Sequence, residues 1–279
     1  MAEQFPSGVL PDAGAGDFHA LTRKISKERG FGCASYKEKC LRRRIAVRMR
    51  ARGVHTYEDY SRILETDEGE YDRLLDTLTI NVTKLFRNWD VYASMATNVI
   101  PVLWERQTPV RVWSAGCSSG EEPHSLAILF HRYAESRGQL HHLRRIDVLG
   151  TDIDRRCLAA AARGEFEEAD FTDTPDELRA NYFTPTAPFT AIPAVRSIVR
   201  FERRDMLSDG APPGGHDLIV CRNVLIYFDR DTQERLFETF YEALAPGGFL
   251  VLGKVETLIG DVRSKFVPID ARERIFKRP

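Results

Sequence analysis

The sequence has no excess of charge of either sign and no apolar run long enough to cross a bilayer. Its 279 residues carry 40 basic and 41 acidic side chains, a formal net charge of −1. This balance gives no overall attraction to nucleic acid or to an anionic membrane. No run of about 18 apolar residues occurs, so we expect no membrane insertion. Residues 1–17 lack the basic-then-apolar order of a signal peptide, and we expect them to form a flexible tail of a cytoplasmic protein.

Cysteine and histidine patterns typical of metal or disulfide sites are also missing. The five cysteines are odd in number, and no two have the C-x-x-C spacing. A disulfide framework or a zinc site is therefore not expected, and reduced thiols are. The seven histidines form no cluster with ligand spacing, since His141 and His142 are adjacent rather than one helical turn apart. We expect no metal cofactor.

The first part of the chain predicts a small all-helical domain over residues 18–85. Apolar residues recur there at helical spacing. Helices are expected at residues 35–52, 57–65 and 70–79, with a serine before the first and a glycine after it as start and stop signals. No alternating strand pattern interrupts them.

The second part, residues 86–279, changes to strands that alternate with helices. Strands are expected at residues 111–115, 146–151, 199–203, 217–221, 249–253 and 274–277. Helices are expected at residues 121–135, 155–162 and 233–244. This alternation predicts an α/β domain with a mostly parallel sheet. Residues 164–198 break the rhythm with proline, threonine and aromatic residues, and are expected to be an insertion.

The loop that begins at Gly116 follows the first strand and leads directly into a helix. A dinucleotide site would place a second glycine where Ser118 stands, so that the backbone could approach a pyrophosphate. Glu121 and Glu122 follow at the start of the helix, where the helix dipole stabilises a carboxylate. Carboxylates there would repel phosphate and attract an ammonium group. The loop indicates a cofactor with adenosine, ribose and a positive charge; ordinary acids at a helix start are the alternative.

Polar residues also follow two other strands. Asp152 ends the second strand, where an acid binds ribose hydroxyls in nucleotide-binding folds. Asp154 is the alternative ribose ligand, but it could equally cap the next helix. Arg222, Asn223 and Tyr227 follow the strand at 217–221 and should lie near the pocket mouth, because ligands of open α/β sheets bind beyond the carboxyl ends of the strands. A core strand with a chance polar edge is the alternative.

The helix at 35–52 is strongly basic. Eight residues between positions 37 and 52 are basic and one, Glu38, is acidic. One interpretation is a solvated face; the other is docking to an acidic partner helix. Nucleic acid is a poorer match because only Tyr36 supplies an aromatic ring nearby and the chain is near neutral. The expected docking residues are Arg42, Arg43, Arg44, Arg48 and Arg50.

Taken together, the motifs of the chain closely resemble the CheR-type chemotaxis receptor methyltransferases, from about Phe18 to the C-terminus. The motifs are Asn81-Val-Thr-Lys-Leu-Phe-Arg87, Trp113-Ser-Ala-Gly-Cys-Ser-Ser-Gly-Glu-Glu-Pro-His-Ser125, Asp152-Ile-Asp154, Cys221-Arg-Asn-Val-Leu-Ile-Tyr-Phe-Asp229 and Pro246-Gly-Gly248. The resemblance implies a small helical domain followed by a Rossmann-like methyltransferase domain with a small β-rich insertion. It also implies transfer of a methyl group from S-adenosylmethionine to glutamate side chains of chemoreceptors, leaving S-adenosylhomocysteine.

The resemblance further implies roles for individual residues. Glu122 would meet the methionine amino group and Asp152 the ribose. Arg87 and Tyr227 would lie nearest the reacting carboxylate. The full set implied for the cofactor is Asn81, Thr83, Arg87, Gly116, Glu122, Asp152, Asp205, Met206, Arg222 and Asn223, with Asp205 and Met206 beside the adenine. The partners would be the cytoplasmic methylation helices of chemoreceptors, and the enzyme would be a monomer.

The chain departs from the common family pattern at three places: Leu85 for phenylalanine, His124 for tyrosine, and Lys254-Val255-Glu256 for His-Ser-Glu. The chemistry needs no strong general base, because a glutamate with a pKa of about 4.3 is already ionised at neutral pH. Two other functions stay open at this point. They are a cofactor-binding scaffold without catalysis and a methyltransferase that acts on nucleic acid through the basic helix.

Overall fold

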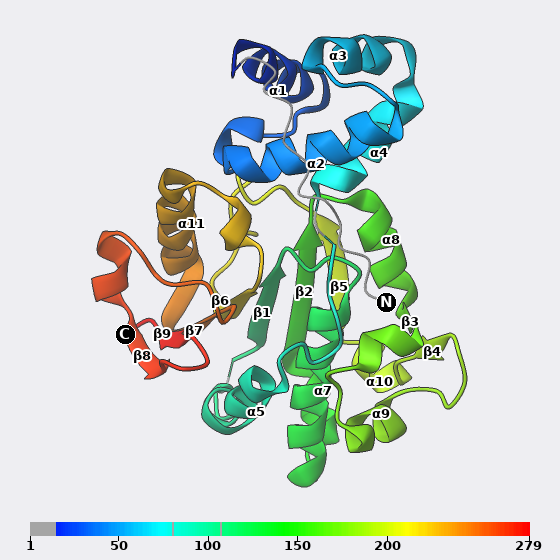
Figure 1. Cartoon of the computed structure of the whole chain (residues 1–279). Coiled ribbons are helices and arrows are strands. Elements are labelled where there is room, and N and C mark those ends of the chain that lie inside the picture. The colour runs from blue at the N-terminus through cyan, green and yellow to red at the C-terminus, as the bar shows by residue number, and fades with distance from the viewer. Residues whose placement is uncertain (1–14, 80, 107) are drawn as a thin grey trace, which may run out of the picture. The chain divides into compact units, whose positions relative to one another are not determined.

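The computed structural model describes residues 15–79, 81–106 and 108–279 (Figure 1). The chain forms two compact units, one of Met1–Ile80 with Tyr227–Asp229 and one of Asn81–Ile226 with Arg230–Pro279. Most of the expected tail, residues 1–17, lies outside the described residues. Its last three residues already belong to helix α1 (Ala15–Arg29).

In its described part, the first unit is built from helices, as the sequence predicts. They are α1, η1 (Cys33–Ser35), α2 (Glu38–Ala51), α3 (Tyr57–Thr66) and α4 (Glu68–Leu78). Side chains fix two of the starts: Thr56 accepts a hydrogen bond from the Asp59 N–H at 3.1 Å, and Asp67 accepts one from the Glu70 N–H at 3.2 Å. Such caps satisfy backbone donors that have no partner inside the helix.

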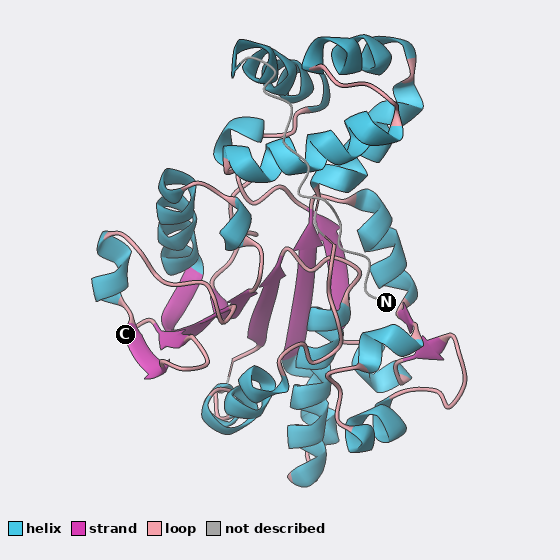
Figure 2. Ribbon diagram, in the orientation of Figure 1, coloured by secondary structure: helices cyan, strands magenta, loops and turns pink. Residues whose placement is uncertain are grey.

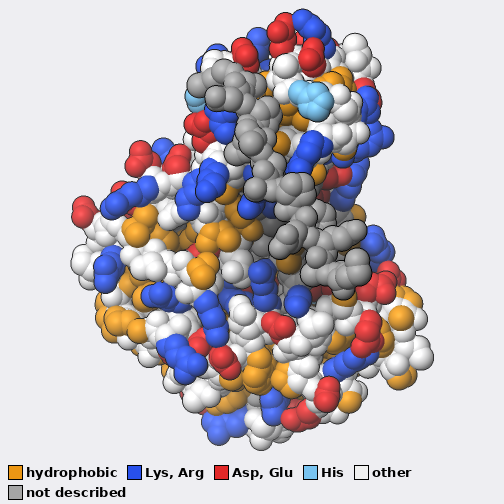
Figure 3. All heavy atoms as spheres, viewed as in Figure 1, with side chains coloured by type: hydrophobic (Ala, Val, Ile, Leu, Met, Phe, Trp, Pro, Cys, Tyr) orange, Lys and Arg blue, Asp and Glu red, His pale blue; other side chains and the backbone are white. Residues whose placement is uncertain are grey.

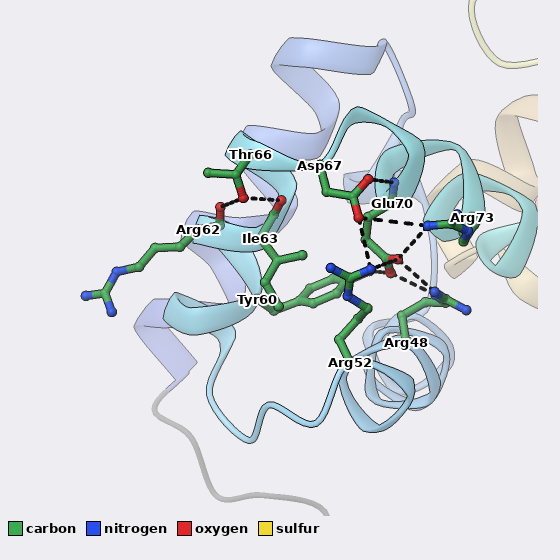
Figure 4. A network of polar contacts seen from close by, with 9 residues as sticks. All are labelled: Arg48, Arg52, Tyr60, Arg62, Ile63, Thr66, Asp67, Glu70 and Arg73. Atoms are coloured by element: carbon green, nitrogen blue, oxygen red, sulfur yellow. Dashed lines mark hydrogen bonds and ion pairs between the residues drawn. The ribbon is translucent and has the colours of Figure 1, made fainter.

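A buried carboxylate joins α2 to α4 in this unit (Figure 4). Glu70 is fully buried and accepts two hydrogen bonds from Arg48, each 2.8 Å long, and one from the Tyr60 hydroxyl at 2.9 Å. Arg52 and Arg73 lie 3.7 and 3.6 Å from the same carboxylate. Burial alone would raise the pKa of Glu70, but these donors hold it below its usual value.

The second unit is an α/β domain around a seven-stranded sheet (Figure 2). Its strands are β1 (Val110–Ala115), β2 (Ile146–Asp152), β5 (Val199–Arg203), β6 (His216–Cys221), β7 (Leu244–Leu252), β8 (Val267–Asp270) and β9 (Ile275–Lys277). The order is β5-β2-β1-β6-β7-β9-β8, and only the pairs made by β9 are antiparallel. The predicted mostly parallel sheet is therefore confirmed.

The helices of this unit include two that the sequence did not predict. The helices are α5 (Trp89–Asn98), α6 (Ile100–Trp104), α7 (Glu121–Ser136), α8 (Arg155–Arg163) and α11 (Arg230–Ala243), with the 3-10 turns η2 (Leu140–Arg145), η4 (Leu225–Tyr227) and η5 (Asp261–Lys265). The unpredicted pair is α5 and α6.

Strand β6 lies inside the sheet and is buried at every position, as expected for a strand covered on both faces.

The expected insertion at 164–198 contains a small antiparallel pair, β3 (Glu165–Phe166) with β4 (Phe189–Thr190). It also contains η3 (Glu168–Phe171), α9 (Asp176–Tyr182) and α10 (Pro193–Arg196). Phe171 packs edge-on against Phe183 and Phe189, with ring centroids 4.9 and 5.2 Å apart. This aromatic cluster is continuous with the hydrophobic core of the second unit, so the insertion is packed onto that core.

Candidate functional site

The candidate site lies at the carboxyl ends of the parallel strands. Strands β2 and β5 follow β1 on one side and β6 lies on the other, a switch point of the kind at which α/β sheets bind ligands. The register pairs Ala115 with Thr151 and Asp152 with Arg203. Predicted residues from four loops therefore meet at this edge: Gly116, Asp152, Asp205, Met206, Arg222 and Asn223.

The turn after β1 depends on two glycines. Gly116 has φ +78°, and a Cβ there would lie 2.7 Å from a methyl carbon of Val224. Gly120 has φ +96°, and its Cβ would lie 2.8 Å from the Cβ of Ala161, so α7 starts against α8. Ser118 between them also has a positive φ of 49°. Its Oγ is buried without a hydrogen-bond partner among the described residues, which is a polar atom available to a ligand.

Glu122 and Arg222 form a buried pair of opposite charge. The Arg222 Nη1 lies 3.7 Å from the Glu122 carboxylate, which also accepts a hydrogen bond from Ser114 at 2.8 Å. Burial raises the pKa of Glu122, while the charges of Arg222 and Arg87 oppose that rise. A carboxylate beside guanidinium groups is complementary to a zwitterion that carries an ammonium and a carboxylate.

Asp152 ends β2 and Asp154 comes shortly after it, and the two carboxylates accept different hydrogen bonds. Each carboxylate oxygen of Asp152 accepts one backbone N–H, from Ser118 and from Asp154, both at 2.9 Å. Asp154 caps α8 by accepting the N–H groups of Arg156 and Cys157, and it also accepts the Asn81 amide at 2.8 Å. Burial raises the pKa of Asp152, whereas these donors outweigh burial at Asp154 and lower its pKa.

The segment Asn81–Asn88 lies along the same edge. Asn81 binds Asp154, as described, and Thr83 lies close enough to Glu121 to lower the pKa of that carboxyl. The Arg87 Nη1 donates to the Val82 carbonyl at 2.7 Å. The predicted cofactor residues Asn81, Thr83 and Arg87 are thus placed by contacts with the site loops or within their own segment.

Two buried carboxylates of the site are not among the predicted cofactor residues. Glu256 is 4% exposed and accepts the N–H groups of Gly253, Asn223 and Leu225 at 2.7, 3.0 and 2.8 Å. These bonds support Asn223 at its positive φ of 61°. Glu121 is 3% exposed and binds the Ser119 hydroxyl. A lone glutamate just after the apolar strand at 249–253 is the feature of the sequence that could have indicated Glu256.

The remaining predicted residues belong to the helical unit. Tyr227 accepts the Lys37 N–H with its carbonyl at 2.9 Å, and Phe228 packs against Tyr36. On α2, three of the five predicted docking arginines contact other helices of the unit, whereas Arg50 donates to the Ala46 carbonyl of its own helix at 3.3 Å. Arg42 binds Glu38 and lies 4.0 Å above the ring of Phe18, Arg44 donates to the Thr77 carbonyl at 2.7 Å, and Arg48 binds Glu70. Arg43 and Arg50 are exposed.

Metal-binding clusters and membrane-spanning helices are both absent from the described residues. No group of three or more His, Cys, Asp or Glu side chains there could hold a metal ion. None of the helices in this part of the chain is long and apolar enough to cross a membrane.

The sheet order, the glycine turn after β1, the aspartate that ends β2 and the buried Glu122–Arg222 pair define an S-adenosylmethionine-dependent methyltransferase. A family model described as the CheR methyltransferase SAM binding domain matches residues 81–275, and the CheR methyltransferase all-alpha domain matches residues 16–79. The chain belongs to the CheR methyltransferase family.

Curated relatives support this membership over nearly the whole chain. A chemotaxis protein methyltransferase of Listeria monocytogenes is 34% identical over 253 residues, 90% of this chain and 93% of the relative. Those of Klebsiella aerogenes and Escherichia coli are 33% and 30% identical, covering 92% and 86% of this chain and 86% and 83% of the relatives. The chain is thus an S-adenosylmethionine-dependent protein-glutamate O-methyltransferase that acts on chemoreceptors, and the predicted family, fold, enzyme class and cofactor are confirmed.

Proposed function

We propose that the edge of the sheet described above binds S-adenosylmethionine, and that Arg87 and Tyr227 act on the receptor glutamate. The observation that carries the proposal is the buried Glu122–Arg222 pair with Arg87 close enough to influence the pKa of Glu122. Charges of both signs at a strand end suit the methionine part of the cofactor, which is itself a zwitterion. A pyrophosphate would be repelled by the Glu122 carboxylate.

The residues of the edge fit the remaining parts of the cofactor. Asp152 is the proposed ribose ligand rather than Asp154, because Asp154 already accepts three hydrogen bonds, from the α8 cap and Asn81, whereas each oxygen of Asp152 accepts one backbone N–H and can accept another. The turn that carries Asp205 and Met206 begins next to Asp152, whose carbonyl accepts the Arg204 N–H at 3.0 Å. This proximity supports adenine binding by Asp205 and Met206. Gly116 and Asn223 complete the set.

S-adenosylmethionine bound there would supply a methyl group on a sulfonium, and the neutral thioether of S-adenosylhomocysteine would be the leaving group. The substrate glutamate is already a carboxylate at neutral pH, so the protein has no proton to remove. Arg87 orients that carboxylate toward the methyl group, since alignment and exclusion of water are what remain for the enzyme to provide. A single guanidinium contact orients the carboxylate while leaving one oxygen free to attack. Tyr227 shapes the channel for the methyl group.

The proposed partner is the acidic, glutamate-bearing helical region of a chemoreceptor on the cytoplasmic side, and the enzyme acts as a monomer. The exposed face of α2 supports this docking. Lys39, Arg43, Val47 and Arg50 are exposed and follow one another at intervals of three or four residues, which places them on one side of the helix. Positive charge on this face favours an acidic helix and speeds encounter at low salt. Arg42, Arg44 and Arg48 instead have the structural contacts described above.

The role of Arg87 is tested by Arg87→Ala. We expect the methylation rate to fall by roughly 100-fold, because a misplaced carboxylate costs about that much. Binding of S-adenosylhomocysteine, measured by calorimetry, should weaken far less, since the other cofactor residues remain.

The matched control is Arg137→Ala, which removes an exposed arginine of the same unit. Its rate should equal that of the unmodified enzyme. Near-normal turnover of Arg87→Ala with intact cofactor binding would rule out the proposed role.

A further inference from the structure

The segment that carries Arg87 has an unfavourable backbone. Phe86 and Asn88, the neighbours of Arg87, have φ angles of +52° and +60°. Residues other than glycine rarely adopt this region, and they stay there only where surrounding contacts enforce it. Asn88 also precedes α5 without a side-chain cap for that helix. The position of Arg87 therefore depends on what holds this segment.

One set of contacts comes from the insertion. The Asp173 carboxylate accepts the Asn88 N–H at 2.8 Å with one oxygen, and its other oxygen lies 3.7 Å from Lys84 Nζ. The backbone N–H and the backbone carbonyl of Leu85 are both hydrogen-bonded to the insertion. Its N–H donates to the Asp170 carbonyl at 3.0 Å, and its carbonyl accepts the Thr174 hydroxyl at 3.2 Å. Residues 170–174 thus contact the segment at both ends.

The opposite side of the segment is held by the site itself. Arg222 Nη2 donates to the Arg87 carbonyl at 2.8 Å and to the Asn88 side chain at 3.2 Å. The Phe86 N–H donates to the Ser125 hydroxyl of α7 at 2.9 Å. Arg87 is therefore fixed between the methyl-donor end of the site and the insertion.

The insertion side of this arrangement is itself rigid. Glu167 and Asp170 form reciprocal capping hydrogen bonds around η3. Arg179 binds Glu168 with two hydrogen bonds and lies 4.8 Å above the ring of Phe171. Residues 170–174 are consequently an anchored turn, and a contact from such a turn restricts the segment it touches.

We infer that Asp173 is a positioning residue that fixes Arg87 by holding the Asn88 N–H. The inference rests on the proposed function of Arg87. It assigns the 164–198 insertion a part in methyl transfer. The Asp173 carboxylate acts through the backbone of the segment that carries Arg87, and not by contact with substrate or cofactor.

Two substitutions separate positioning from general stability. Asp173→Ala removes the acceptor for the Asn88 N–H, whereas Asp173→Asn keeps an acceptor oxygen and loses only the charge toward Lys84. The matched control is Asp176→Asn, an exposed acid of the same insertion at the start of α9. We expect kcat to fall roughly tenfold or more in Asp173→Ala, to recover largely in Asp173→Asn, and to be unchanged in the control.

A second readout needs neither cofactor nor receptor. Amide hydrogen exchange of residues 82–90 should be roughly tenfold faster in Asp173→Ala than in Asp173→Asn, because local opening of the segment becomes easier.

A double variant gives a third, kinetic test. In an Arg87→Ala background, Asp173→Ala should cause no further loss of kcat, since the effects of two residues that act as one unit are not additive.

Equal exchange rates in the two Asp173 variants would overturn the inference, and so would an additive loss of kcat. If the unmodified enzyme transfers no methyl group to receptors, the proposed function fails instead. The exchange experiment then still decides whether Asp173 holds the segment.

Discussion

Glu121 and Glu122 are adjacent in sequence but are stabilised in different ways. Glu122 faces guanidinium groups, whereas Glu121 accepts a hydrogen bond from the Ser119 hydroxyl, and Thr83 and its own backbone also favour the ionised form. Burial outweighs those hydrogen bonds and raises the pKa of Glu121 to about 7 from 4.5. The folded protein therefore keeps a proton on Glu121 that the unfolded chain releases.

This difference in bound protons makes the free energy of unfolding depend on pH. Below pH 4.5 both states are protonated, and between pH 4.5 and about 7 only the folded state holds the proton. The free energy of unfolding should therefore fall as pH rises through this window, by about 3 kcal/mol in total. Glu121→Gln cannot lose a proton and should abolish the fall, so the variant becomes the more stable protein above neutral pH.

Urea unfolding at several pH values measures this difference. Glu105→Gln, an exposed glutamate of the same unit, should follow the unmodified protein at every pH. Parallel stability curves for Glu121→Gln and the unmodified protein would show that Glu121 is ionised in the folded state.

Some proposed site residues could be located from the sequence because they lie next to strands. Gly116 follows β1 directly, Asp152 ends β2, and Glu122 lies in the first turn of the helix that follows β1. Glu256 and Asp173 could not be found in this way. Their partners Asn223 and Asn88 are 33 and 85 residues away, and only the folded chain brings them together.

Among the elements, α2 has two kinds of arginine. Arg48 points into the unit and binds the buried Glu70, whereas Arg43 is exposed on the neighbouring face (Figure 4 shows Arg48). Arg48→Ala leaves a buried carboxylate without its main partner and should lower the free energy of unfolding by about 3 kcal/mol. Arg43→Ala should change it by less than about 0.5 kcal/mol but reduce receptor methylation, most clearly at low salt.

Each variant is the control for the other, because both change arginine to alanine on the same helix. Thermal unfolding and the methylation rate as a function of salt are the measurements. Comparable destabilisation by the two substitutions, or a normal methylation rate for Arg43→Ala, would contradict the division of α2 into structural and docking faces.

Helices α5 and α6 and strand β8 were not predicted, because none of them has a clear hydrophobic pattern of its own. Helix α5 buries Val91, Tyr92 and Met95, but the apolar residues continue through α6 and blur the helical period. Strand β8 is exposed at three of its four positions and contains Pro268. It has no burial pattern of its own and depends on its pairing with β9.

At the scale of the whole molecule, charge is balanced overall, and positive and negative side chains are interspersed over the face drawn in Figure 3. Selectivity for a receptor therefore has to come from local faces such as that of α2 and not from net charge. The family could be identified from the sequence because its motifs are short and contiguous. The contacts that position Arg87 could not be identified from the sequence, because they join the insertion to a segment far away in the chain.

All of the proposed residue roles serve one reaction, the methyl esterification of glutamate side chains of chemoreceptors. The most direct test supplies S-adenosylmethionine with a tritiated methyl group to the enzyme together with receptor cytoplasmic fragments, RNA or DNA. We expect label on the receptor that is released as methanol by mild base, and that is lost when the receptor glutamates are replaced by alanine. Base-stable label, label on nucleic acid, or no transfer at all would contradict this expectation.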